Sequence, residues 1–180
     1  MSIQTPPAFS LPAALSSQGY ALRRESEADI PFLMRLYAST REQELAPIPW
    51  SGEQKQAFLA SQFQAQRRHY YKYIPHCAFD VIECNGTPVG RFYLEQQQTQ
   101  LHIVDIALMP DSRGQGLGTA IMQALQAQAA AQGKGVGIFV EKFNPALRLY
   151  RRLGFAITHV DERKFYMRRE HPTGRLRSPS

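Results

Sequence analysis

Short runs rich in β-branched and aromatic residues alternate along this chain with longer segments in which apolar residues recur every three to four positions. The short runs have the length and alternation of β-strands, and the longer segments have the period of amphipathic helices. Asn85-Gly86 separates two of the short runs and is a strong tight-turn signal, so we expect a hairpin there. The predicted strands are residues 21–24, 78–84, 89–95, 101–108, 136–140, 155–160 and 165–168.

Two helices are predicted in the first half of the chain. Ser26-x-x-Asp29 has the pattern of a capping box, and Ser51-x-x-Gln54 has the same pattern before a second helix at about residues 52–69. Proline and glycine residues interrupt the helical period between them.

Two further helices are predicted in the second half, at about residues 119–132 and 144–153. The first of these connects the strand at 101–108 to the strand at 136–140. Such a crossover joins parallel neighbours, whereas the strands before it are expected to be antiparallel.

The chain has 180 residues, of which 43% are hydrophobic, and this is enough for one compact core. We expect a single α/β (α+β) domain over residues 20–168. Residues 1–19 are rich in Ser, Pro and Ala, have no sustained period and are expected to be a flexible arm. Residues 169–180 are expected to be a disordered basic tail.

The formal net charge is +6, and much of the excess lies after residue 147. A solvated basic face, an acidic partner and the phosphate groups of a ligand all fit this bias. No recognised nucleic-acid motif accompanies it, so nucleic-acid binding is not expected.

Only Cys77 and Cys84 are present, and no signal-like segment begins the chain, so a cytoplasmic protein is expected. No apolar run approaches the ~20 residues that cross a bilayer, which argues against a membrane location. No C-x-x-C pair or ligand-like histidine spacing is present, so no metal is expected.

The segment Arg113-Gly114-Gln115-Gly116-Leu117-Gly118 lies between a predicted strand and a predicted helix. Free N–H groups and the helix dipole favour an anion at such a turn, and glycines keep side chains out of its way. No G-K-[ST] follows, and the spacing misses G-x-G-x-x-G, which disfavours nucleotide sites of the Walker and dinucleotide types. The segment therefore predicts a site for a pyrophosphate.

The pattern R-x-x-G-x-G of this segment resembles the acyl-CoA-binding motif of the GNAT family of N-acetyltransferases. Residues 144–155, Asn-Pro-Ala-Leu-Arg-Leu-Tyr-Arg-Arg-Leu-Gly-Phe, are similar to the signature N-P-A-x-x-L-Y-x-x-x-G-F of the same family. The second segment also has the features of a helix, with Asn144 as its cap and Gly154 at its end. The resemblance covers roughly residues 20–168.

This resemblance implies a single-domain GNAT fold, with a mixed sheet of about six to seven strands, helices on both faces and a splayed strand pair that binds acyl-CoA. It implies acetyl-CoA as cosubstrate and the Leu108 amide as a candidate oxyanion donor. The cofactor-binding residues that it implies are Ala107, Leu108, Met109, Arg113, Gly114, Gln115, Gly116, Leu117, Gly118, Thr119 and Asn144.

Two residues are candidates for proton transfer. Tyr150 lies where the family often has its general acid, and a phenol with a pKa of ~10 can protonate a thiolate at neutral pH. His102 lies on the strand where many relatives place a base, and its pKa of ~6.5 suits proton removal. The two-residue period of a strand places Asp105 on the face opposite His102.

For both residues a structural role is the alternative, with Tyr150 in the core and His102 at a half-exposed strand position. A water relay to a carboxylate such as Glu44 or Glu83 is an alternative to His102 as the base.

The predicted function is transfer of an acetyl group from acetyl-CoA to a primary amine by direct attack in a ternary complex. A CoA-binding sensor or interaction module without turnover is the alternative. The acceptor is expected to be a small molecule or a peptide, and the protein is expected to be a monomer or homodimer. Nothing in the sequence selects one amine.

Overall fold

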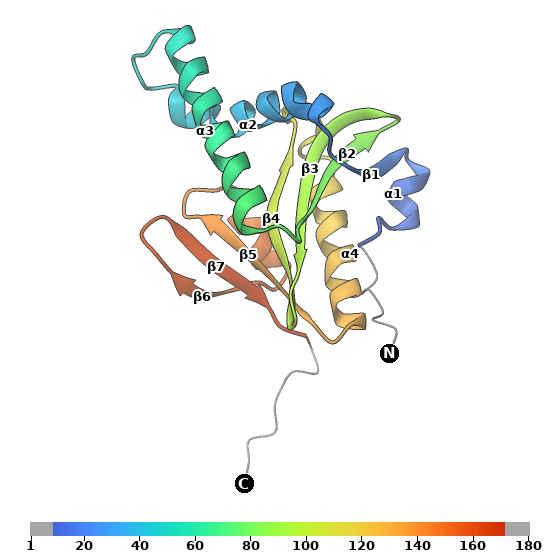
Figure 1. Ribbon diagram of the computed structural model, residues 1–180. Helices are drawn as coiled ribbons and strands as arrows, with labels where there is room; N and C mark the ends of the chain where they lie inside the picture. Colours follow the sequence, from blue (N-terminus) through green and yellow to red (C-terminus); the bar gives the residue numbers. More distant parts are fainter. Residues whose placement is uncertain (1–8, 172–180) are drawn as a thin grey trace.

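The structure, a computed structural model, describes residues 9–171. Its seven strands form one mixed sheet in the order β1-β2-β3-β4-β5-β7-β6 (Figure 1). The strands are β1 (Tyr20–Arg24), β2 (Ala78–Cys84), β3 (Thr87–Gln96), β4 (Gln100–Leu108), β5 (Gly135–Glu141), β6 (Ala156–Val160) and β7 (Lys164–Arg169). The helices are α1 (Ala13–Ser17), α2 (Ile30–Leu45), α3 (Gly52–Tyr73), α4 (Leu117–Ala131) and α5 (Leu147–Arg152), with 3-10 turns η1 (Glu27–Asp29) and η2 (Pro110–Ser112).

The strand pairing confirms the predicted topology. β4 and β5 are parallel, and every other neighbouring pair in the sheet is antiparallel. The hairpin at Asn85-Gly86 joins β2 to β3, and both residues have positive φ, at 50° and 81°, as a tight two-residue turn of this kind requires. The prediction of a single α/β domain with a sheet of six to seven strands is confirmed.

Helices cover both faces of the sheet, with α4 on one face and α2 and α3 on the other (Figure 1). The main core lies under α4, and most of its buried side chains come from α4 and from the strands β2, β3, β4, β5 and β7, with Leu15 of α1 and Tyr150 of α5 added at its edges. Each such side chain contributes about 1.5–3 kcal/mol when fully buried. The most enclosed members of this core are Ile82, Phe92, Leu101, Ile103, Ile121, Met122, Leu125 and Met167.

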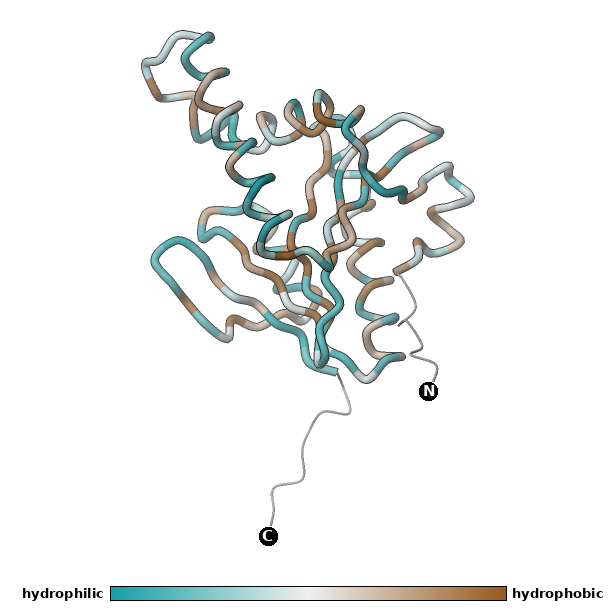
Figure 2. The backbone as a smooth tube through the Cα atoms, in the orientation of Figure 1, coloured by the Kyte–Doolittle hydropathy of each residue, from teal (hydrophilic) through white to brown (hydrophobic). Residues whose placement is uncertain are grey.

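The opposite face has two smaller clusters, and α3 meets it with a more polar surface. The hydropathy colouring shows this difference, since the half of α3 that ends at Tyr73 is mainly hydrophilic (Figure 2). The first cluster joins α2, α3 and β2 through Leu33, Leu36, Phe63 and Val81. The second consists of Cys77, Phe79 and Tyr93, with Tyr70 and Val104 packed against it.

α3 begins where the sequence predicts and ends later. Ser51 and Gln54 form the expected capping box, with Oγ of Ser51 accepting from the N–H of Gln54 at 3.1 Å. The helix continues to Tyr73 because Tyr70 and Tyr71 have partners on the sheet. The Tyr71 ring stacks on Phe79 with centroids 4.5 Å apart.

The structure corrects part of the expected N-terminal arm. Residues 1–8 lie outside the described residues, but residues 9–19 include α1 and pack on the domain. Leu15 is 5% exposed in the main core, and the Phe9 ring contacts Phe92 at 5.2 Å. Burial of these two side chains anchors a segment whose helix is too short to have a recognisable period. At the other end, β7 continues to Arg169, and residues 172–180 of the predicted tail lie outside the described residues.

β4 and β5 separate halfway along their length, as the resemblance implies. Their ladder runs only from the pair Gln100–Gly135 to the pair Ile103–Ile138. β4 continues to Leu108 and β5 to Glu141 without pairing to each other. The remaining edge of β4 is therefore open toward β5.

A β-bulge in β4 corrects the prediction for Asp105. The register against β3 shifts between Tyr93 and Leu94, which pair with Asp105 and Ile103, so Val104 is an additional residue. Leu101 and Ile103 face the core under α4, whereas Val104 packs against the cluster of Cys77, Phe79 and Tyr93 on the opposite face, and Asp105 accepts from the Tyr70 hydroxyl of α3. The bulge therefore places Asp105 on the same face as His102, and the prediction of opposite faces is wrong.

Candidate active site

The glycine segment forms the turn into α4. Gly114 and Gly116 have positive φ, at 72° and 83°, and Gly116 is the N-cap of the helix. A Cβ atom at Gly114, Gly116 or Gly118 would meet nothing within 4 Å, so the turn borders open space. The three glycines thus provide both the backbone conformation and the room that a ligand needs.

The backbone N–H groups of residues 114 to 119 find no acceptor in the part of the chain that the structure describes. The first helical bond of α4 is from Ala120 N–H to the Gly116 carbonyl, at 3.0 Å. N–H groups at a helix N-terminus carry partial positive charge from the helix dipole. The predicted set from Gly114 to Thr119 is therefore available to an anionic group.

Arg113, the first residue of the glycine segment, binds two groups of the protein with its guanidinium. Its Nε donates to the Leu108 carbonyl at 2.9 Å, and its Nη2 donates to Ser39 Oγ at 3.2 Å. The side chain thus ties the turn to the end of β4 and to α2. Its charge remains next to the turn while its donors hold the backbone in place.

The resemblance implies that Ala107, Leu108 and Met109 contact the cofactor, but their backbone N–H groups point in different directions. Met109 N–H donates to the Val89 carbonyl at 2.8 Å, and the Met109 carbonyl accepts from Ser112 at 2.9 Å. Because backbone groups alternate in direction along an antiparallel ladder, the N–H of Ala107 also faces β3. Leu108 and Ile106 face the opening toward β5.

Of the three predicted residues, only Leu108 has its N–H available in the opening. Ile106 also has its N–H there, and the sequence analysis did not predict it as a cofactor-binding residue. The register of the ladder would identify Ile106, but the sequence does not reveal this register. Ala107 contributes its side chain to the cluster beneath α2 and α3 instead.

Tyr150 lies on α5 with its ring in the main core. The residue is 5% exposed, and its ring packs against Phe155 with centroids 5.9 Å apart. Its hydroxyl has no hydrogen-bond partner among the described residues, yet it is not one of the fully enclosed unpaired atoms. The ring is therefore a core element, and the hydroxyl is accessible at the edge of the core.

Burial raises the pKa of Tyr150 to about 12, and the negative charge of Asp105 adds to the increase. A phenol with this pKa is protonated at neutral pH and can donate a hydrogen bond, and then its proton, to negative charge that develops beside it.

The prediction of Asn144 as the cap of the helix is wrong, because Ala146 is the N-cap of α5 and Asn144 lies in the turn before it. The Oδ1 atom of Asn144 accepts from the N–H of Ala146 at 2.8 Å, in the turn that precedes α5. The α-helix itself begins at Leu147, later than predicted. Asn144 is exposed, so its side-chain NH₂ group remains available for a ligand.

Asp105 has one carboxylate oxygen bound and one open. Arg91 Nη2 donates to Oδ2 at 2.6 Å, and the Tyr70 hydroxyl donates to the same oxygen at 3.2 Å. Oδ1 has no partner among the described residues, and 17% of the side chain is exposed. Arg91 is 3% exposed and is held by Gln66 Oε1 at 3.0 Å, so a buried cation fixes the orientation of the carboxylate.

His102 lies inside the paired part of β4. It pairs with Gly137 of β5, is 8% exposed, and contacts the rings of Phe139 and Tyr166. Burial lowers the pKa of His102, against the raising effects of the Glu95 charge and of a hydrogen bond to the Gly137 backbone. The imidazole is thus enclosed and neutral near pH 7, and its Nδ1 has no partner in the described structure.

The two carboxylates that we considered for a water relay already have ion-pair partners. Glu44 is paired with Arg41 on the outer part of α2, and Glu83 accepts from Arg23 Nε at 2.6 Å. Glu83 also lies on β2, which β3 separates from β4. Asp105 is closer to the open strand edge than either of them.

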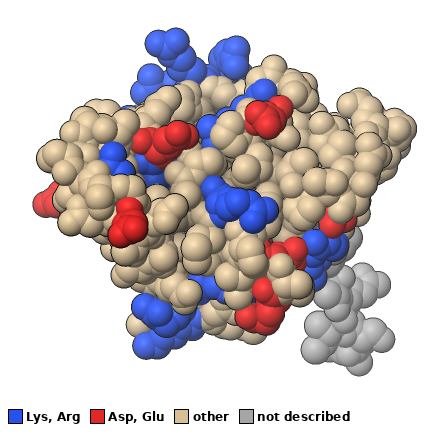
Figure 3. Space-filling model, turned by 90° about the horizontal axis from the view of Figure 1, so that it is seen from above, with Lys and Arg blue, Asp and Glu red and all other residues tan. Residues whose placement is uncertain are grey.

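Charge is mixed on the face seen from above, where Lys and Arg are interspersed with Asp and Glu (Figure 3). Within residues 9–171 no helix is long and apolar enough to cross a membrane. In the same range no group of three or more His, Cys, Asp or Glu side chains is arranged to hold a metal ion.

A mixed sheet whose parallel strands part beside a turn of free N–H groups is the arrangement that the resemblance to the acyl-CoA-dependent GNAT acetyltransferases implies. The family model of the acetyltransferase (GNAT) family matches residues 36–155, and the chain belongs to this family. A search of the curated proteins found no match.

Solved structures of similar fold agree with this assignment. The PaiA N-acetyltransferase of Thermoplasma acidophilum, in complex with coenzyme A, is 16% identical with a TM-score of 0.63, over 84% of this chain and 98% of that one. A GCN5-related N-acetyltransferase structure from Rhodopseudomonas palustris is 21% identical with a TM-score of 0.59, over 83% and 94%. Arabidopsis thaliana Naa50, in complex with the bisubstrate analogue CoA-Ac-MVNAL, is 16% identical with a TM-score of 0.52, over 84% and 99%.

Proposed function

We propose that this protein transfers an acetyl group from acetyl-CoA to a primary amine, by direct attack of the amine in a ternary complex. The observation that carries the proposal is the row of free N–H groups from Gly114 to Thr119 beside the open edge of β4. This row suits a diphosphate, and the open strand edge suits the amide-bearing arm of the coenzyme. Family membership and the coenzyme complexes of two structural neighbours support the choice of ligand.

In this proposal the backbone of β4 stabilises the charge that develops on the thioester oxygen. The Leu108 N–H points into the opening, and a fixed donor in a site shielded from water lowers the barrier without reorganisation. The Arg113 contact with the Leu108 carbonyl holds this part of the strand in position.

Tyr150 donates its proton to the departing thiolate. Its raised pKa of about 12 keeps the hydroxyl protonated, and this hydroxyl has no hydrogen-bond partner among the described residues. Asp105 Oδ1 takes the proton that the attacking ammonium loses, directly or through a water molecule. We place this step at Asp105 rather than at His102, because His102 is enclosed in the paired part of the sheet.

Acetyl-CoA mixed with a panel of primary amines tests the proposal. We expect release of free coenzyme thiol that depends on the amine, together with a product that is heavier by one acetyl group in mass spectrometry. Binding of acetyl-CoA without turnover of any amine would contradict the proposal and would favour a sensor or interaction module.

A further inference from the structure

Three aromatic rings on the α3 side of the sheet form a surface that the proposed reaction does not use. We call His102, Phe139 and Tyr166 the aromatic platform. The Phe139 ring lies 5.5 Å from the His102 ring and 4.7 Å from the Tyr166 ring, measured between centroids. Phe139 is 52% exposed, although it is flanked in sequence by buried core residues of β5.

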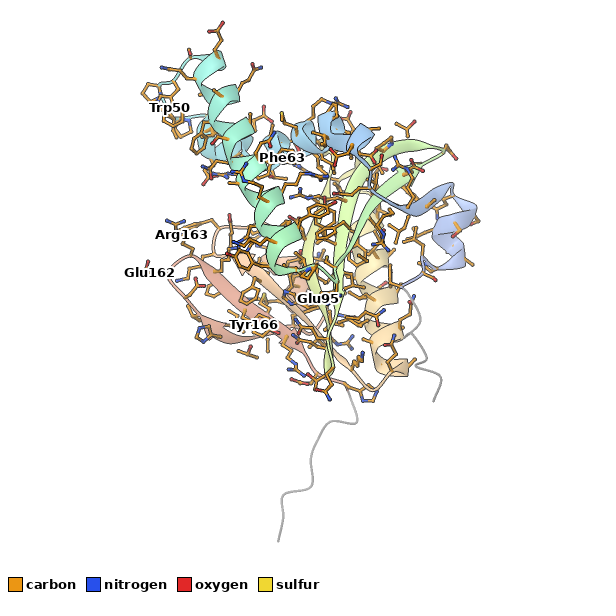
Figure 4. All side chains as sticks on the ribbon, in the orientation of Figure 1. Trp50, Phe63, Glu95, Glu162, Arg163 and Tyr166 are labelled. Atoms are coloured by element: carbon orange, nitrogen blue, oxygen red, sulfur yellow. The ribbon has the colours of Figure 1, made fainter. Side chains whose placement is uncertain are left out.

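A partly buried hydrogen bond fixes the orientation of the Tyr166 ring in the platform. The Tyr166 hydroxyl donates to Gln100 Oε1 at 2.8 Å, and Gln100 is itself 7% exposed. A Cβ atom at Gly137 would lie 2.5 Å from the Tyr166 hydroxyl, so the glycine makes room for this bond. Tyr166 projects from β7, beyond the part of the sheet that α3 crosses (Figure 4). Rings ordered in this way bind a flat or apolar group at little cost in conformational entropy.

The platform borders the proposed reaction centre. Phe139 directly follows Ile138, the last residue of β5 that pairs with β4, and Asp105 follows the corresponding point of β4. Both side chains are on the α3 side of the sheet. Both residues lie within two positions of the last β4–β5 pair, where the strands are about 5 Å apart, so one small molecule can span them.

We propose that the acceptor is a primary amine with an aromatic or branched apolar group a few bonds from the nitrogen, its ammonium on Asp105 Oδ1 and its apolar group on Phe139. This inference rests on the proposed acetyl transfer and adds the class of the substrate. A free aromatic amine and an amino-terminal residue with an apolar side chain share this chemistry. The rim of the platform carries Glu95, opposite His102 in the β3–β4 pair, which suits a cationic ligand.

The test compares two small amines of similar basicity, 2-phenylethylamine and 2-methoxyethylamine, and two dipeptides, Phe-Ala and Ser-Ala. We expect kcat/KM to be at least about tenfold higher for the aromatic member of the preferred pair, since an aromatic contact adds to the burial of apolar surface. If kcat/KM is larger for the two small amines, the acceptor is a free amine; if it is larger for the two dipeptides, the acceptor is the amino terminus of a peptide.

Phe139→Ser should remove this preference through a higher KM for the aromatic acceptor and leave the KM for acetyl-CoA unchanged. Phe143→Ser is the matched control, because Phe143 is 99% exposed and lies outside the platform. Asp105→Asn should lower kcat/KM for the aromatic and polar amines alike, which separates recognition of the ammonium from recognition of the ring.

Equal rates with aromatic and polar amines, or an unchanged preference in Phe139→Ser, would overturn this inference and leave the proposed acetyl transfer intact. No transfer to any amine would overturn both. A wild-type dimer that Phe139→Ser converts to a monomer in sedimentation would show that a second copy of the chain covers the platform, and this result would also overturn the inference.

Discussion

At the scale of single residues, two side chains of the site each have one part that contacts the protein and another part that has no partner in it. Tyr150 buries its ring and leaves its hydroxyl accessible, and Asp105 binds Arg91 through one oxygen and leaves the other open. The bound part fixes the orientation, and the open part is available for chemistry. The same division explains why the core interpretation of Tyr150 and the catalytic one are compatible.

Replacing Tyr150 by Phe tests its role as the acid. The ring packing is retained, so we expect little change in acetyl-CoA affinity and a decrease in kcat of about 100-fold, which is typical for loss of a positioned acid. Steady-state kinetics and calorimetry on the same preparation measure both quantities. Equal turnover in the variant would make Tyr150 a packing residue only.

His102 makes a prediction for the pH dependence of stability. Burial lowers its pKa in the folded protein, so below about pH 6.5 the unfolded chain binds the proton more readily. The free energy of unfolding should therefore fall as the pH decreases from 6.5 toward 5. Asp29, whose pKa the Arg23 guanidinium lowers to about 2, contributes only below about pH 4.

Urea denaturation at pH 7.5 and 5.5 checks this difference, with His102→Asn as the comparison. The variant should lose less stability than the wild type between the two pH values, because it has no group to protonate there. A decrease of the same size in both proteins would show that His102 is not responsible.

At the scale of elements, α3 is attached to the sheet by buried polar bonds. Glu25, whose side chain is 1% exposed, accepts from Arg67 Nη1 and from the Tyr71 hydroxyl, both at 2.5 Å, and also from the Tyr93 hydroxyl. The neighbouring residues on the same helix, Gln66 and Tyr70, contact Arg91 and Asp105 respectively. The helix thus positions the buried cation behind the open carboxylate.

Removing Glu25 should weaken this attachment. We expect Glu25→Ala to lower the free energy of unfolding by about 3 kcal/mol, since it leaves a partly buried guanidinium without its partner. Glu44→Ala is the control, because Glu44 is paired with Arg41 at an exposed position, where the expected loss is below about 1 kcal/mol. Similar losses in the two variants by urea denaturation would contradict a structural role for the Glu25 bonds.

Most elements were predictable because their signals are local. The Asn-Gly turn, the capping box of Ser51 and Gln54, and the glycine turn before α4 each depend on a few neighbouring residues. The bulge in β4 was not predictable, because the segment from Leu101 to Leu108 contains no glycine or other signal of an extra residue. Contacts of Val104 and Asp105 with side chains from α3 and β3 determine it.

At the scale of the whole molecule, the sheet order brings distant parts of the chain to one opening. The edge of β4, which leads into the turn before α4, and the aromatic platform both adjoin the point where β4 and β5 part. The two motifs near residues 113 and 144 mark the turns before α4 and α5, which we propose as the coenzyme side of the site. The acceptor side depends on Arg91, Asp105 and Phe139, which belong to no motif, and only the folded structure relates them.

The central claim is that the N–H groups around the start of α4 bind the diphosphate of acetyl-CoA. Gly118→Glu tests it without strain, because a Cβ atom at Gly118 meets nothing within 4 Å and the position has no positive φ. Gly52→Glu, in the first turn of α3 and equally unobstructed, is the matched control.

Calorimetric titration of the three proteins with acetyl-CoA is the most direct measurement. A carboxylate beside the diphosphate should weaken binding by about 100-fold in Gly118→Glu, as expected for like charges in contact, and Gly52→Glu should bind as the wild type does. Unchanged affinity in Gly118→Glu, or equal losses in both variants, would contradict the account.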